Sequence, residues 1–288
     1  MTQGPPGKGR TKGRAAWQRL LRQPLPFVSL LVLIVLHLAV VLGPRVWTIS
    51  PLATDPINAL LDPNPQHPFG TDELGRDELA RLLQGGQVSL VVGFASMVTS
   101  IVLGLAIGAV AGFYGGLTST VLMRITDAML AIPSFFLILA AVTVFGASPA
   151  TIVLIIGATS WMPVARVIFG ETLRWKAAEF VQAAQSIGAG GLYVLGRHIL
   201  PQTIASVVVS ATLGVGFAIL TESAISYLGL GIQPPTASWG NMLQNAQQYV
   251  FTSASLAVYP GAFVTIVVLA YNFLGDGLRD ALDPRLTQ

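Results

Sequence analysis

The chain has 288 residues, of which 53% are apolar and only 10% are charged, and its formal net charge at pH 7 is +3. Soluble domains carry about 25% charged residues, so 13 acids and 16 bases are too few to cover a soluble core of this size. The absence of cysteine from the sequence excludes disulfides, thiolate chemistry and cysteine-ligated metals.

Long apolar stretches predict an all-α, polytopic membrane protein with about six transmembrane helices. A helix rises 1.5 Å per residue, so about 20 apolar residues cross a hydrocarbon core of about 30 Å. The predicted spans are residues 26–43, 88–112, 118–144, 150–169, 203–220 and 256–274. We therefore divide the chain into a tail (1–24), a first transmembrane helix (25–45), an outer segment (46–87) and a core of five further spans (88–288).

The tail is basic and sets the predicted orientation. Its first 22 residues contain no acid and six bases, namely Lys8, Arg10, Lys12, Arg14, Arg19 and Arg22. Basic flanks stay in the cytoplasm, so we expect both termini and residues 170–202 inside and the acidic segment 46–87 outside. A cleaved signal peptide is disfavoured because the first apolar core, of about 18 residues, exceeds the usual 7–15. The tail lacks interleaved aromatics, so the expected partner is membrane lipid and not nucleic acid.

Small and charged residues within the spans admit two interpretations each. Gly104, Gly108 and Gly112 are four apart and share one helix face, where another helix can approach closely. We favour packing within this chain over contact with a partner subunit. Arg124 and Asp127 are three apart, which predicts an ion pair on one helix face, either structural or at the cytoplasmic mouth of a pathway.

Two prolines and one carboxylate complete the unusual residues of the spans. Pro133 and Pro163 remove backbone hydrogen bonds and predict bends in the third and fourth spans. Glu222 follows the fifth span on the outer side. It is predicted either to anchor the helix at the interface or to line the outer mouth.

Residues 170–202, which we call the coupling loop, predict a helix–turn–helix between the fourth and fifth spans. Phe180, Ala183, Ala184 and Ile187 form an apolar stripe at helical spacing, with Glu179, Gln182 and Gln185 off it. Glycines from Gly188 onward break this helix. A second stripe of Leu192, Leu195 and Ile199 follows, and Pro201 is predicted to limit its extension. The loop either packs on its own spans or docks a separate protein; periodicity alone favours neither.

The coupling loop resembles the EAA loop of ABC importer permeases. In that family E-A-A is followed by three residues, Gly, nine residues and I-x-L-P; here Gln182-Ala-Ala, Gly188 and Leu200-Pro201 fall in register. Gln182 replaces the glutamate, and His198 replaces the first isoleucine. The replaced glutamate puts in doubt any polar contact that its carboxylate makes in the family.

Further motifs resemble the dipeptide/oligopeptide permeases of the C type. Taken in order over residues 25–286, they are the segments 67–77, 123–127 with Pro133, 222–231, 234–240 and 274–285. The resemblance implies a type I ABC importer permease fold in the bacterial inner membrane. It also implies half of a translocation pathway for di- or oligopeptides, completed by a homologous permease subunit.

The resemblance further implies that a separate machine supplies the energy. Two cytoplasmic ATPase subunits would bind ATP and Mg²⁺, and an extracytoplasmic peptide-binding protein would deliver substrate. This chain would bind no cofactor or metal and would not be an enzyme; it has no G-x-x-x-x-G-K-[ST] phosphate loop. The ATPase contact would fall on Glu179, Phe180, Gln182, Ala183, Ala184, Ile187, Gly188, Leu200 and Pro201.

Alternative functions remain open at this stage. Related permeases carry nickel chelates or glutathione, and the sequence does not separate these substrates. A stand-alone secondary transporter would need carboxylates near the midplane, whereas Asp127 and Glu222 lie nearer the span ends. A membrane hydrolase would need a grouped catalytic set, and the three histidines are dispersed.

Overall fold

The computed structural model describes residues 17–282, which form helices joined by irregular loops. Most of the basic tail, including Lys8, Arg10, Lys12 and Arg14, lies outside the described residues, as does Arg285. The long helices are α2 (Pro24–Val46), α3 (Glu78–Tyr114), α6 (Pro149–Lys176), α9 (Leu200–Tyr227) and α11 (Ser255–Leu282). The shorter elements are a 3₁₀ turn (Pro56–Asn58), α4 (Gly116–Leu130), α5 (Ser134–Phe145), α7 (Glu179–Ser186), α8 (Gly191–Val194), a π-helical turn (Leu195–Ile199) and α10 (Trp239–Ala246).

The predicted all-α membrane architecture is confirmed. Among the described residues, five helices are long and apolar enough to cross a bilayer, and the bent pair of α4 and α5 gives a sixth crossing if it counts as one span. These helices match five of the six predicted stretches. α3 has 37 residues and begins ten residues before the predicted span at 88–112, so it extends well beyond the hydrocarbon core.

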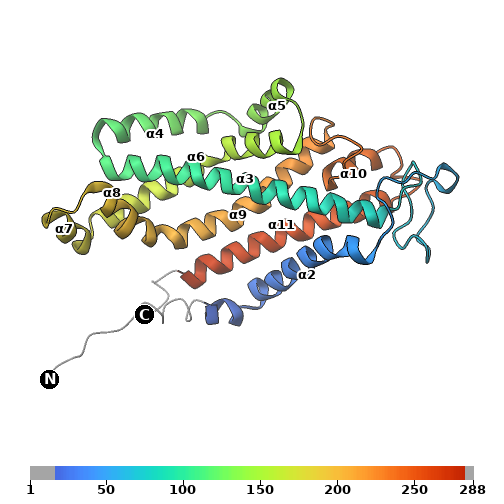
Figure 1. Ribbon diagram of the computed structural model, residues 1–288, viewed down its shortest axis with the longest axis horizontal. Coiled ribbons are helices and arrows are strands. Elements are labelled where there is room, and N and C mark those ends of the chain that lie inside the picture. The colour runs from blue at the N-terminus through green and yellow to red at the C-terminus, as the bar shows by residue number, and fades with distance from the viewer. Residues whose placement is uncertain (1–16, 283–288) are drawn as a thin grey trace.

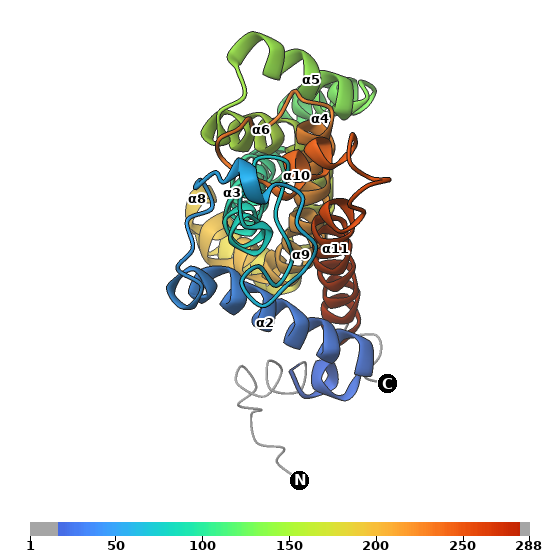
Figure 2. The ribbon, with the colours of Figure 1, turned by 90° about the vertical axis from the view of Figure 1, so that its right-hand side faces the viewer.

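The long helices lie side by side, and the short elements gather at the two ends (Figure 1). α7 and α8 lie at one end, which we call the loop end. α10 and the loop after α2 lie at the other, which we call the cap end and which faces the viewer in Figure 2. In both views α4 and α5 run along one side of the bundle.

The third predicted span is not one straight helix. α4 and α5 meet at an angle of 85° with a break at residues 131–133. Pro133 has no N–H to continue the hydrogen-bond ladder, and its ring restricts the residue before it to extended conformations. At 1.5 Å per residue, neither the 15 residues of α4 nor the 12 of α5 span about 30 Å alone. The single continuous span predicted over 118–144 is therefore wrong.

The glycine face of α3 packs on α6, as predicted. A Cβ at Gly104 would lie 2.7 Å from the Val164 side chain, and one at Gly108 would lie 2.4 Å from the Ala165 carbonyl oxygen. At Gly112 it would lie 2.7 Å from Thr172. The two helix backbones thus approach closely at three successive turns, which fixes α3 and α6 as the central pair of the fold.

We expect Gly108→Ala to lower the unfolding temperature of the detergent-solubilised protein. The added methyl meets a carbonyl oxygen that cannot move without separating α3 from α6, and overpacking typically costs about 1–3 kcal/mol. Gly170→Ala on α6 is the matched control, because a Cβ there meets nothing within 4 Å. It should be neutral or stabilising, since alanine favours helix over glycine. Equal unfolding temperatures for the two variants would contradict this packing.

A single carboxylate joins three segments at the cap end. Asp77 caps α3, because its Oδ1 accepts from the backbone N–H of Ala80 at 2.7 Å. The Trp47 Nε1–H at the end of α2 donates to the same oxygen at 2.8 Å, and His67 Nδ1 lies 2.8 Å from Oδ2. Residues 47–77 are thereby fixed to the ends of α2 and α3.

Candidate functional site

The coupling loop lies at the loop end, outside the five long apolar helices (Figure 1). α6 continues to Lys176, the short helix α7 follows, and residues 187–190 turn the chain into α8. The helix–turn–helix expected from the sequence is therefore present. Its second helix does not end where predicted, because α8, the π-helical turn and α9 form one continuous 37-residue span from Gly191 to Tyr227. Pro201 sits in the first turn of α9, where its missing N–H costs little, and does not stop the helix.

One side of the coupling loop is buried against the bundle. Val181 and Ala184 of α7 belong to the main hydrophobic core, together with Val194, Leu195 and Ile199 of the following helix. The predicted stripe of Phe180, Ala183, Ala184 and Ile187 is thus wrong as a burial face, since only Ala184 is buried. Val181 and Ala184, three residues apart, form the inward edge instead.

The opposite side of the loop is apolar and exposed. Ile187 is 87% exposed and Leu192 is 75% exposed, while Tyr193 and Phe180 are also classed as exposed. The Tyr193 and Phe180 rings flank His198, with ring centroids 5.6 Å and 6.4 Å from its own. Large side chains left open on a loop outside the lipid mark a surface suited to protein contact. The remaining predicted contact residues are exposed (Glu179, Gln182, Ala183, Gly188, Pro201) or half-buried (Leu200).

Gly188 ends α7 in a left-handed conformation, with φ of +88°. Its N–H donates to the Gln185 carbonyl at 3.0 Å, and the Ala189 N–H donates to the Ala184 carbonyl at 3.1 Å. This pair of bonds is a Schellman motif, which favours glycine because a Cβ is strained at positive φ. A Cβ at Gly188 would meet nothing within 4 Å, so the glycine is needed for the backbone turn and not for space.

The loop is tied to the end of α3 through one residue, Phe113. The Lys176 ammonium at the end of α6 donates to the Phe113 carbonyl and lies 5.5 Å from the ring centroid. A Cβ at Gly191 would lie 3.0 Å from the same ring. Movement of the loop is therefore coupled mechanically to the central α3–α6 pair.

The predicted Arg124–Asp127 pair is not formed. Asp127 on α4 pairs with Arg166 on α6, whereas Arg124 is exposed. An ion pair between two helices holds α4 against α6, whereas the predicted pair would have linked residues of one helix. Sequence reasoning missed Arg166, and an arginine inside an apolar span was the signal that a carboxylate elsewhere must lie near it.

Glu222 is buried and lies neither at an interface nor at an outer mouth, so both predictions for it are wrong. Its exposed fraction is 0%, inside the bundle near the cap end. Its carboxylate oxygens accept hydrogen bonds from Ser89 of α3 at 2.9 Å and from Ser226 of α9 at 2.7 Å. Those hydroxyls in turn accept from the backbone N–H of Trp239 and of Ile232. Glu222 thus connects two spans to the cap end.

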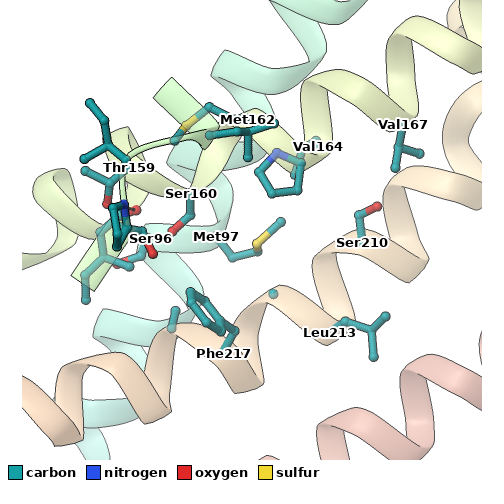
Figure 3. A pocket seen from close by; sticks show the side chains of 18 residues that line it. Ser96, Met97, Thr159, Ser160, Met162, Val164, Val167, Ser210, Leu213 and Phe217 are labelled. Carbon is teal, nitrogen blue, oxygen red and sulfur yellow. Dashed lines mark hydrogen bonds between the residues drawn. The ribbon is translucent and has the colours of Figure 1, made fainter. Parts of the chain in front are cut away.

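A cavity of about 460 Å³ lies among α3, α6, α9 and the bend between α4 and α5 (Figure 3). Residues 130–134 of the bend and Pro163 of α6, both predicted from sequence as sites of bending, line it. Its polar lining consists of five hydroxyls, those of Ser96, Ser134, Thr159, Ser160 and Ser210. Sequence reasoning did not identify these residues, although hydroxyls within apolar spans are a signal that could have found them.

Charged groups are scarce near the cavity. None of its 18 lining residues has an ionisable side chain, and neither Asp127 nor Glu222 is among them. Among the described residues, no group of three or more His, Asp and Glu side chains is placed to hold a metal ion. What the cavity offers chemically is neutral hydrogen bonding and apolar contact.

These features define the class: a multi-span helical membrane protein with a mid-depth polar cavity and a helical docking loop. Residues 104–288 match the family model of the binding-protein-dependent transport system inner membrane component, and residues 11–63 match the N-terminal transmembrane domain of oligopeptide transport permease C. The chain belongs to this family of inner-membrane transport components.

Similar proteins cover nearly the whole chain. It is 36% identical to a dipeptide transport system permease protein of Alkalihalophilus pseudofirmus over 95% of this chain and 90% of that protein. It is 38% identical to a glutathione transport system permease protein of Escherichia coli, over 98% and 93%. It is 35% identical to an oligopeptide transport system permease protein of Bacillus subtilis, over 94% and 89%.

Proposed function

We propose that this chain is the permease subunit of an ATP-driven ABC importer for di- or oligopeptides in the bacterial inner membrane. It forms half of the translocation pathway, and a homologous permease forms the other half. Two ATPase subunits bind ATP and Mg²⁺ at the cytoplasmic side, and an extracytoplasmic peptide-binding protein delivers substrate. The chain itself binds no cofactor and catalyses no reaction.

The observation that carries this proposal is similarity along almost the entire chain to permeases of peptide systems. The similar proteins are named for dipeptide, oligopeptide and glutathione transport, at 35–38% identity. Glutathione is itself a tripeptide, so one substrate class, short peptides, covers all three names. The neutral cavity, with room for a small solute, is compatible with that class.

The coupling loop supports an ATPase partner. Its inner side is buried in the bundle through Val181 and Ala184, while its outer side presents Phe180, Ile187 and Leu192. Basic residues at this end, Arg174, Lys176 and Arg197, favour a cytoplasmic location. We therefore propose that the exposed apolar side chains insert into a groove of one ATPase subunit and transmit its closure to α3 and α6.

The arrangement of the span carboxylates disfavours a stand-alone secondary transporter. Such proteins use midplane carboxylates that face a cavity to couple solute to ions. Here Asp127 is paired with Arg166, and Glu222 is fully buried among serines. Neither is available to bind a coupling ion in the cavity.

Reconstitution tests the proposal. The complete transporter, with both permeases, the ATPase pair and the binding protein in proteoliposomes, should accumulate dialanine, trialanine or glutathione only with hydrolysable ATP. Omitting this chain should abolish accumulation. Uptake by this chain alone under an ion gradient, or no peptide uptake by the complete assembly, would contradict the proposal.

A further inference from the structure

The cavity is placed at the depth where solute must pass. Ser96, Ser160 and Ser210 lie near the middle of the predicted spans 88–112, 150–169 and 203–220. The break between α4 and α5 at residues 131–133 falls in the middle of the remaining stretch and forms another wall. Four structural elements therefore enclose one space halfway across the membrane (Figure 3).

Two hydroxyls in the cavity wall lack protein partners. Ser96 is 1% exposed, and neither its Oγ nor that of Ser160 has a hydrogen-bond partner among the described residues. Pro163 adds an acceptor, because it has no N–H to donate to the carbonyl of Thr159 four residues earlier. Thr159 and Pro163 both line the cavity. The wall thus offers hydroxyl groups and a backbone carbonyl that need partners.

These polar groups indicate what occupies the cavity. A lipid tail or an apolar helix would leave the hydroxyls unsatisfied, at a cost in free energy. A charged side chain would find no opposite charge, because none of the lining residues is ionisable. A peptide main chain fits both restrictions, since its amides are neutral and supply donors and acceptors. Met97, Met162 and Phe217 give apolar, adaptable contact for side chains of differing shape.

We infer that this cavity is a contact site for the main chain of the transported peptide and that it does not discriminate between peptide side chains by charge. The inference rests on the proposed function and adds the site and the basis of its tolerance. Ser96 and Ser160 provide the directional hydrogen bonds. Selection among peptides by charge is then left to other parts of the assembly.

Introducing a charge tests the inference. In the complete transporter, Ser160→Asp and Ser210→Asp should each raise the uptake ratio of Ala-Lys to Ala-Glu about tenfold over the wild-type ratio, which corresponds to about 1.4 kcal/mol of charge interaction. Dividing by the wild-type ratio removes any preference of the binding protein. Ser206→Asp on the same helix is the control, because Ser206 does not line the cavity; its ratio should equal that of the wild type.

Cysteine labelling gives a second readout that tolerates weakly active variants. The chain has no cysteine, so Ser160→Cys supplies its one thiol, and the wild-type complex gives the background from the partners. A small water-soluble methanethiosulfonate should modify this thiol, and dialanine should slow the reaction. An unreactive thiol, as in a lipid-filled or closely packed site, overturns the assignment.

The outcomes separate the two proposals. Wild-type transporter that takes up none of the peptides contradicts the proposed function. Wild-type uptake with unchanged ratios in both lining variants overturns the cavity assignment alone.

Discussion

Ile187→Asp is expected to reduce ATP-driven peptide uptake at least about a hundredfold while leaving membrane insertion and unfolding temperature unchanged. Ile187 is 87% exposed, so the substitution removes almost no contact within the chain. In the proposed ATPase groove the new carboxylate would be desolvated without a partner, at a cost of about 3–5 kcal/mol, and each 1.4 kcal/mol is tenfold in affinity. ATPase co-purification and uptake in proteoliposomes measure the effect.

Gln185→Asp is the matched control for this prediction. Gln185 is also exposed on α7 but lies about 200° around the helix from Ile187, away from the apolar side chains. It introduces the same charge into the same helix and should leave uptake near the wild-type rate. Equal loss in both variants would indicate a general charge effect, and normal uptake with Ile187→Asp would refute the docking surface.

Ala184 is less suitable for this test, although the sequence placed it in the predicted contact. It is buried in the core of the loop with Val181. An aspartate at Ala184 would disrupt the loop before any partner binds. At Gly188, a substitution would strain the positive-φ turn. Only the exposed side chains separate docking from folding.

Most of the fold could be predicted from the sequence because the bilayer imposes a length on apolar helices. Five of the predicted stretches correspond to long helices, and the spacing of Gly104, Gly108 and Gly112 identified a packing face. The third span failed because hydropathy reports composition and not direction. Residues 118–144 are continuously apolar enough, but the chain bends by 85° before Pro133.

Pairings between distant residues explain most of the errors in the site. Sequence spacing proposed Arg124 for Asp127, yet Arg166, some 40 residues away, forms the pair across two helices. The buried side of α7 was also misassigned by one position, because an eight-residue helix offers too few turns to fix its phase. Pro201 was interpreted as a stop, whereas a proline in the first turn of a helix is compatible with continuation.

The cavity could not be predicted, because it depends on how four elements meet. Single hydroxyls in Ser96, Ser160 and Ser210 are common in spans, and nothing in their spacing places them together. The bend at Pro133 and the nearby Pro163 create the space between the helices. Their predicted role as bending points was therefore correct in place, but its consequence needed the three-dimensional arrangement.

Glu222→Ala is expected to destabilise the protein by about 2–4 kcal/mol and to lower the yield of assembled transporter. The substitution leaves the hydroxyls of Ser89 and Ser226 without their acceptor in a fully buried position, and each unsatisfied group costs about 1–3 kcal/mol. The loss extends to the cap end, because the same hydroxyls accept from the N–H groups of Trp239 and Ile232. The unfolding temperature in detergent measures it.

Two further variants distinguish a hydrogen-bonding role of Glu222 from simple space filling. Glu222→Gln keeps the volume and one carbonyl acceptor, so it should lose much less stability than Glu222→Ala. In a double-mutant cycle, Ser226→Ala should cost little once Glu222 is already alanine, because the bond between them at 2.7 Å has gone. Strictly additive losses would mean that the two side chains act independently. Strong coupling would show that α9 and the cap end are held together through this buried carboxylate.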